Sequence, residues 1–168
     1  MTNSNAYQVI LEGNFGSGKS ELLAALKASS NEIDVYPKAL RGDIMSRHPT
    51  LLDLHCKSPK RWNYTVQQYS MFLMLERNRS ALFSTASVKI YERSLGAVVN
   101  VFAPALLTYK QITQIELDLL MDWAAELAIH DAVKPDLIIY LRRDPQKCLE
   151  KCKNLPGHQM GRLLAKVR

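Results

Sequence analysis

The sequence predicts an α/β fold with three layers, in which helices flank a mainly parallel sheet of about four strands. Short runs typical of strands recur along the chain, at residues 88–91 and 136–141 among others. Segments with helical periodicity separate these runs. A glycine-rich stretch, GNFGSGKS at residues 13–20, stands between the first apolar run and the first helical segment. Strands separated by helices form parallel sheets with right-handed crossovers.

Length and composition indicate one domain over residues 1–168. With 168 residues and 47% hydrophobic content, the chain can bury a sizeable core. No apolar run approaches the ~20 residues that cross a bilayer. Three cysteines are an odd number, and residues 1–6 do not resemble a secretory leader. We therefore expect an intracellular, cytoplasmic protein, with the nucleus or an organelle lumen left open.

Charge and cysteine spacing narrow the choice of ligands. The net charge of +6 and the pI of 9.3 favour anionic ligands, which include nucleotides and nucleic acids. The basic residues are dispersed and do not alternate with aromatic residues, so a nucleic-acid surface is not expected. Cys148 and Cys152 lie four residues apart on a predicted helix without histidine partners. They indicate buried packing rather than a metal site.

The first half of the chain contains the pattern strand, loop, helix, strand. Residues 8–12 (QVILE) form the expected first strand, and residues 19–28 carry leucines at helical spacing. A second strand is expected over residues 32–36, ended by Pro37. Ser58 and Pro59 suit an N-cap and a first helical turn. The helix that follows should reach about Ser80, with an apolar stripe formed by Trp62, Val66, Tyr69 and Leu73.

The second half repeats the alternation. Residues 88–91 (VKIY) form the third expected strand. Thr113 and Glu116 form a capping box before a long amphipathic helix. The amphipathic character is indicated by an apolar stripe that repeats every four residues, Ile115, Leu119, Trp123 and Leu127. Residues 136–141 (DLIIYL) read as a strand covered on both faces, and Asp144 and Pro145 begin a last helix.

The glycine-rich loop matches a phosphate-binding motif. Gly13, Gly18, Lys19 and Ser20 satisfy the pattern G-x-x-x-x-G-K-[ST], between a strand and a helix. Glycines let backbone N–H groups crowd around phosphate oxygens, and the helix adds its positive dipole end. Lys19 would reach the β and γ phosphates and Ser20 would bind Mg²⁺. The alternative, a glycine-rich turn without a ligand, is disfavoured by this context. The expected contacts of the nucleotide phosphates are Gly13, Asn14, Gly16, Ser17, Gly18, Lys19 and Ser20.

Four segments together resemble one enzyme family. LEGNFGSGKS, KRWNYTVQQY, IYERSLGAVVNVF and PDLIIYLRRDP occur in this order between residues 8 and 154. They resemble the deoxynucleoside kinases, including thymidine kinases of the cellular and herpesvirus-related type. The resemblance implies transfer of a phosphoryl group from ATP, with Mg²⁺, to the 5′-hydroxyl of a deoxynucleoside. It also implies a homodimer through helices at residues 94–107 and 111–130.

The resemblance assigns roles on the substrate side. Gln67 matches the glutamine whose amide pairs with the nucleobase, since an amide offers both donor and acceptor. Met71 and Met74 would form an apolar wall, and Phe102 resembles the aromatic that stacks on the base. For these three side chains, ordinary core packing is the alternative. Tyr36 is expected beside the substrate.

On the phosphate side, Glu92 and Arg93 match an acidic-Arg-Ser motif. Glu92 would hold Mg²⁺, and Arg93 would neutralise charge on the transferred phosphoryl group beside Lys19. The alternative for these two residues is a surface ion pair. Arg142, in YLRRDP, would contact the nucleotide.

The chain departs from the family in three places. The family has a glutamate before the proline that ends strand two, where it accepts the proton of the 5′-hydroxyl; here the residue is Tyr36, a poor base at neutral pH. Asp34 or Asp43 could substitute. The lid segment carries Lys151 and Lys153, with Arg162 later, in place of several arginines. We also expect the fifth strand, which helps to form the adenine pocket in relatives, to be missing.

These departures leave two main hypotheses. The first is an active deoxynucleoside kinase. The second is a catalytically impaired homologue that serves as a nucleotide-binding or assembly protein. A nucleoside monophosphate kinase shares the loop and the acidic-Arg pair, but Gln67 and the EGN sequence favour a nucleoside substrate.

Overall fold

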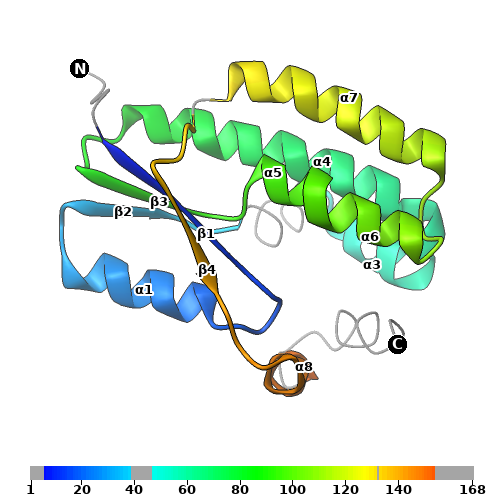
Figure 1. Ribbon diagram of the computed structural model, residues 1–168, viewed down its shortest axis with the longest axis horizontal. Helices are drawn as coiled ribbons and strands as arrows, with labels where there is room; N and C mark the ends of the chain where they lie inside the picture. The colour runs from blue at the N-terminus through cyan, green and yellow to red at the C-terminus, as the bar shows by residue number, and fades with distance from the viewer. Residues whose placement is uncertain (1–5, 39–46, 132, 154–168) are drawn as a thin grey trace. The chain divides into compact units, whose positions relative to one another are not determined.

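The computed structural model describes residues 6–38, 47–131 and 133–153 (Figure 1). The chain divides into two compact units. The sheet unit comprises Asn5–Pro37, Ala86–Glu92 and Pro135–Arg168. The helical unit comprises Met1–Ser4, Lys38–Thr85 and Arg93–Lys134. Each unit has its own hydrophobic core, and the expectation of one kinase-like domain over the whole chain stays a prediction.

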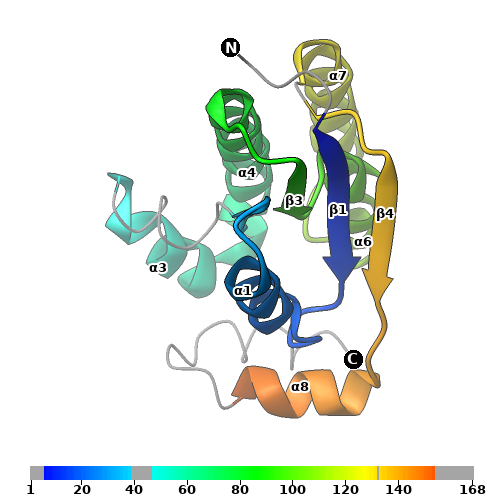
Figure 2. The ribbon, with the colours of Figure 1, turned by 90° about the vertical axis from the view of Figure 1, so that its left-hand side faces the viewer.

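The sheet unit contains four parallel strands in the order β2-β3-β1-β4. Their bounds are Tyr7–Gly13 for β1, Ile33–Tyr36 for β2, Val88–Glu92 for β3 and Leu137–Leu141 for β4. Figure 2 shows β1 and β4 side by side. All four expected strands are therefore confirmed, within a residue or two at each end. The parallel sheet with helices between its strands confirms the predicted fold class.

Two helices belong to the sheet unit. Helix α1, Lys19–Ser29, begins directly after the glycine-rich loop and packs its leucines on the sheet. The core between them consists of Val9, Leu11, Leu23 and Ile90, with Leu22 and Leu26 against it. Helix α8, Pro145–Lys153, begins where Asp144 and Pro145 predict a helix. The strand, loop and helix arrangement required by the phosphate-binding motif is thus present.

Strand β4 differs from expectation. Its residues form a strand, but Ile138 is 62% exposed and Tyr140 is 64% exposed, so the prediction of coverage on both faces is wrong here. In the described part of the chain β4 lies at the edge of the sheet and pairs only with β1. An unbroken apolar run predicts extended backbone, whereas coverage depends on which other elements pack against the strand.

The helical unit is built around helix α4, Pro59–Ser80. These bounds confirm the helix expected from Ser58 and Pro59, although the Ser58 side chain accepts no capping hydrogen bond. The predicted stripe is also confirmed, since Val66 and Leu73 are buried beside Trp62 and Tyr69. The other elements of this unit are α3 (Pro49–Lys57), η1 (Ala81–Phe83), α5 (Leu95–Ala97), the π-helix η2 (Val98–Phe102), α6 (Ala103–Thr108) and α7 (Gln114–His130).

Helix α7 confirms its predicted cap, but only part of its predicted apolar stripe packs against the core. The Thr113 N–H donates to Glu116 Oε2 at 2.7 Å, and the Glu116 N–H donates to Thr113 Oγ1 at 3.3 Å. Ile115 and Trp123, however, are 63% and 48% exposed, while Leu120 is fully buried. A spacing of four residues drifts by about 40° per step around a helix with 3.6 residues per turn. The face packed against the core consists of Leu117, Leu120, Ala124 and Leu127, so Leu127 is the stripe residue that contacts the core.

None of the helices in the described ranges has the length and apolar character that a membrane crossing requires. Cys148 and Cys152 are buried, as predicted. Within residues 6–38, 47–131 and 133–153, no group of three or more histidine, cysteine or acidic side chains could hold a metal ion. The burial of Cys148 and Cys152 confirms their predicted packing role.

Candidate functional site

The loop after β1 has the backbone of a phosphate cradle. Gly13, Gly16 and Gly18 all have positive φ, and Gly18 is the N-cap of α1. A Cβ on Gly13 would lie 2.6 Å from the Leu141 carbonyl oxygen, so only glycine lets β1 end this close to β4. The loop therefore wraps tightly onto the start of α1, whose first backbone N–H groups lack partners within the helix.

Lys19 stands at the centre of this loop. Its ammonium group donates to the carbonyl oxygens of Gly13 and Asn14, each at 2.7 Å, and lies 3.5 Å from Ser17 Oγ. The Lys19 side chain is buried. The loop therefore holds a cation against its own carbonyl groups, where it can turn toward the oxygens of a bound polyphosphate.

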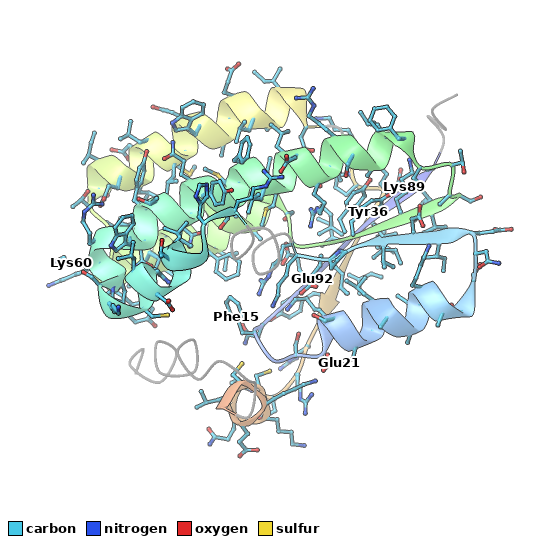
Figure 3. All side chains as sticks on the ribbon, turned by 180° about the vertical axis from the view of Figure 1, so that it is seen from behind. Phe15, Glu21, Tyr36, Lys60, Lys89 and Glu92 are labelled. Atoms are coloured by element: carbon cyan, nitrogen blue, oxygen red, sulfur yellow. The ribbon has the colours of Figure 1, made fainter. Side chains whose placement is uncertain are left out.

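Ser20 and Glu92 bring two hard oxygen ligands together. The Ser20 hydroxyl donates to Glu92 Oε2 at 3.4 Å, joining the first turn of α1 to the carboxyl end of β3. Figure 3 shows Glu92 at this strand end and Phe15 in the loop. Mg²⁺ typically takes one or two protein oxygens and completes its shell with phosphate and water. One hydroxyl and one carboxylate fit this requirement.

Helix α8 packs directly on the loop, an arrangement that sequence reasoning missed. A Cβ on Gly16, whose φ is 75°, would press into the Cys148 carbonyl oxygen and approach Cys152 Sγ at 3.0 Å. Lys151 forms an ion pair with Glu21 in the first turn of α1. The hydrogen bond from Lys151 lowers the pKa of the Glu21 carboxyl. The lysine expected in the lid at position 151 thus contacts α1. The side chain of Lys153 and the whole of Arg162 lie outside the described residues.

Arg142 and Arg143 follow β4 and lie on the surface. The positive charge of Arg143 contributes to the lowered pKa of Glu21, after the larger effects of the Lys151 hydrogen bond and of backbone hydrogen bonding. Arg142 lies one residue beyond the strand that contacts Gly13. Its contact with a nucleotide stays a prediction.

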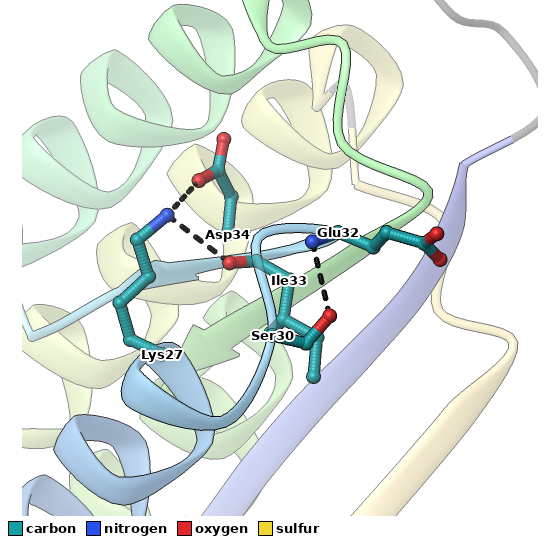
Figure 4. Close-up of polar contacts among 5 residues, drawn as sticks. All are labelled: Lys27, Ser30, Glu32, Ile33 and Asp34. Atoms are coloured by element: carbon teal, nitrogen blue, oxygen red, sulfur yellow. Dashed lines mark hydrogen bonds and ion pairs between the residues drawn. The ribbon is translucent and has the colours of Figure 1, made fainter.

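The end of β2 carries Tyr36 where the family has its base. The Tyr36 ring stacks on Tyr91 of β3, with centroids 4.9 Å apart. Asp34, the first candidate substitute, accepts a 2.5 Å hydrogen bond from the Lys27 ammonium, which also donates to the Ile33 carbonyl (Figure 4). The Asp34 carboxylate is therefore already paired with a cation within its own unit. Asp43 lies outside the described residues.

The helical unit contains the side chains expected at the nucleobase, Gln67, Met71, Met74 and Phe102. Gln67 is partly exposed on α4. Met71 and Met74 are buried in the core with Leu95 and Leu120, the alternative that their residue types left open. Their role as a substrate wall stays a prediction, as does that of Phe102 at the end of η2.

Arg93, the residue after β3, has an unusual conformation. Its φ is 74°, a left-handed value that non-glycine residues rarely adopt. Its guanidinium group lies over the Phe102 ring, 4.6 Å from the centroid. Glu92 is only 2% exposed and Arg93 only 7% exposed, so the alternative of a surface ion pair is wrong. Strained residues of this kind are common at functional sites.

The chain is similar to known nucleoside kinases. The family model described as "Deoxynucleoside kinase" matches residues 9–156. Mitochondrial thymidine kinase 2 of Homo sapiens is 29% identical over 146 residues, covering 86% of this chain and 54% of that protein. Deoxycytidine kinase 2 of Gallus gallus is 29% identical over 169 residues, covering 86% of this chain and 63% of that protein. The probable deoxycytidine kinase of Fowlpox virus (strain NVSL) is 30% identical over 152 residues, covering 90% of this chain and 63% of that protein.

The chain thus spans between 54% and 63% of the length of these relatives. The matched range includes the glycine-rich loop, the Glu92-Arg93 pair, Gln67 and helix α8. The identity of about 29% marks a divergent member. With a family model that matches most of its residues, the chain belongs to the deoxynucleoside kinase family.

Proposed function

We propose that this chain transfers the γ-phosphoryl group of ATP to the 5′-hydroxyl of a deoxynucleoside. The observation that carries the proposal is the 3.4 Å pairing of Ser20 with Glu92 beside a loop that holds the Lys19 ammonium. Lys19 and Ser20 stand at the head of α1, and the buried carboxylate of Glu92 ends β3 beside them. These three groups match the parts of a phosphoryl-transfer site.

Each group on the phosphate side has a defined task. The loop amides hold the β and γ phosphates, and Lys19 exchanges its carbonyl partners for phosphate oxygens. Mg²⁺, held by Ser20 and Glu92, would neutralise charge on the phosphate oxygens when bound. Arg93 stabilises the charge on the transferred group, because a guanidinium can donate two parallel hydrogen bonds to a phosphate. Arg142 contacts the nucleotide from the strand end.

The base of the substrate is recognised by Gln67, whose amide offers one donor and one acceptor. Met71, Met74 and Phe102 bound the apolar part of that site, and the ring of Tyr36 contacts the sugar. The relatives named above carry names of thymidine and deoxycytidine kinases, so pyrimidine deoxynucleosides are the first substrates to test.

The reaction proceeds without the family's usual carboxylate base. Position 36 carries a phenol rather than a carboxylate, and the Asp34 carboxylate is paired with Lys27. Neither residue therefore offers an unpaired carboxylate to accept the 5′-hydroxyl proton. General-base assistance typically contributes about 10²- to 10⁴-fold in rate. Positioning and charge stabilisation supply the rest of the acceleration. We therefore expect a kinase with a low kcat.

A kinase assay with Mg·ATP and thymidine or deoxycytidine tests this. Wild type should form the 5′-monophosphate, and Lys19→Met should lower kcat by at least about 100-fold. Tyr36→Glu should raise kcat by about 100-fold or more, whereas Tyr36→Phe, which keeps the ring, should stay near wild type. Absence of product with wild type and with Tyr36→Glu would sink the proposal.

Tyr36 also favours a second candidate, a catalytically impaired homologue that binds nucleotide and acts in assembly. Here wild type would be inactive while Tyr36→Glu gains activity. We propose a homodimer under either candidate, supported by the exposed apolar residues Ile115, Leu119 and Trp123 on α7. Sedimentation velocity should show a dimer that Trp123→Glu dissociates. Phe83→Glu, at another exposed apolar residue, should leave the dimer intact.

A further inference from the structure

The strained backbone of Arg93 is held by a second arginine. Arg77 lies in the last turn of α4, and its Nη2 donates to the Arg93 carbonyl oxygen at 3.2 Å. The carbonyl belongs to the residue whose φ is 74°. A hydrogen bond from a guanidinium to this oxygen fixes the orientation of the peptide that follows Arg93. The Arg93 side chain in turn lies over Phe102.

Arg77 is itself fixed by two further residues. Its Nε and Nη2 both donate to Asn78 Oδ1, at 3.1 Å and 2.9 Å. Asn78 is buried, and its Nδ2 donates to Asp131 Oδ1 at 2.9 Å. Asp131 is the C-cap of α7, and the same oxygen accepts the Val133 N–H at 3.1 Å. A continuous chain of hydrogen bonds therefore runs from the end of α7 through the end of α4 to Arg93.

We propose that Arg77 is a positioning residue that fixes the backbone and thereby the guanidinium of Arg93, the residue proposed to stabilise the transferred phosphoryl group, with Asn78 and Asp131 fixing Arg77. This inference rests on the proposed function of Arg93. A network of linked hydrogen bonds holds one geometry more firmly than the separate bonds would. Arg77 acts through the backbone of Arg93, so its removal should misdirect the Arg93 guanidinium without removing a substrate contact.

The kinetic test compares Arg77→Gln with Arg79→Gln two residues further along α4, where the side chain is exposed. Arg77→Gln should lower kcat by about 10- to 100-fold, the scale of a misplaced catalytic group. The KM for the deoxynucleoside should stay within about twofold, because Gln67 is untouched. Arg79→Gln should match wild type. Arg77→Lys should restore part of the rate, since it keeps one donor but loses the fork.

A double-mutant cycle separates positioning from a general structural role. If Arg77 acts only through Arg93, then Arg77→Gln should cause no further loss of kcat in an Arg93→Ala background. An undiminished loss in that background would overturn the proposal. So would a wild-type kcat for Arg77→Gln with its fold intact by circular dichroism.

An NMR readout keeps the inference separate from the proposed function. The ring of Phe102 should shift the Arg93 Nε–H signal, which Phe102→Leu identifies by removing the ring. Arg77→Gln and Asn78→Ala should both move that signal, and Arg79→Gln should not. If the wild type is inactive but the signal responds this way, the proposed function fails and the positioning of Arg93 by Arg77 stands. A signal indifferent to Arg77→Gln overturns the positioning itself.

Discussion

Replacing Gly16 with alanine tests how helix α8 meets the phosphate loop. Alanine at a φ of 75° adopts a strained conformation that costs about 1–3 kcal/mol. Its Cβ would also press into the Cys148 carbonyl and lie 3.0 Å from Cys152 Sγ, and overpacking of this kind costs about 1–3 kcal/mol. The Cys148 oxygen is a backbone atom that cannot rotate away. We therefore expect Gly16→Ala to lower the free energy of unfolding by about 2–6 kcal/mol.

Gly96→Ala is the matched control. Gly96 has no positive φ, and the nearest atoms to an added Cβ are 3.8 Å and 3.9 Å away. Alanine also favours helix over glycine, so this variant should equal wild type or gain up to about 1 kcal/mol. Urea unfolding followed by circular dichroism measures both variants. If Gly16→Ala proves as stable as Gly96→Ala, α8 does not pack on the loop as described.

Three further predictions concern the packing, the cap and the ion pair. Leu120→Ala should lower the free energy of unfolding, measured in urea, by about 2–5 kcal/mol. Leu119→Ala, at a neighbour that is 42% exposed, should lower it by under about 1 kcal/mol in the monomer. Equal losses would refute the observed buried face of α7. Thr113→Ala should cost about 1 kcal/mol through the lost cap, and an unchanged urea midpoint would contradict the capping box. The pKa of Glu21 is lowered by Lys151, so this pair stabilises the fold above the ordinary glutamate pKa and loses that effect as pH falls through the lowered value. Lys151→Gln should thus lower the free energy of unfolding by at most about 1 kcal/mol at pH 7, since both side chains are partly exposed. The difference in stability from wild type should vanish in acid. A difference that grows in acid would contradict the assignment.

Local patterns predicted the sheet and the loop well. The apolar runs that became β1, β3 and β4 are short and are flanked by turn or helix signals, so few alternatives compete with an extended backbone. The phosphate loop is specified by glycines whose positive φ values other residues rarely adopt. The capping box at Thr113 and Glu116 involves only neighbouring residues, and it formed as expected.

Features that depend on long-range packing were not predictable in this way. The buried face of α7 could not be predicted because apolar residues occur on several of its faces, and spacing alone cannot choose among them. The contacts of α8 with Gly16 join residues more than 130 positions apart. The bond from Arg77 to the Arg93 carbonyl joins a side chain to backbone, which carries no residue-type signature. The one sequence signal for the α8 contact was the glycine at position 16. The motif accepts any residue there, so a glycine indicates a separate need for close approach of another backbone.

A titration of the chain with ATP, in the presence and absence of Mg²⁺, most directly tests whether the loop and Glu92 form one polyphosphate site. Isothermal calorimetry should show one site per chain for wild type, with affinity that rises when Mg²⁺ is present. Glu92→Gln should keep ATP binding but lose most of the Mg²⁺ effect, and Lys19→Met should weaken binding under both conditions. No heat of binding with wild type, or a Mg²⁺ effect that survives Glu92→Gln, would contradict the account.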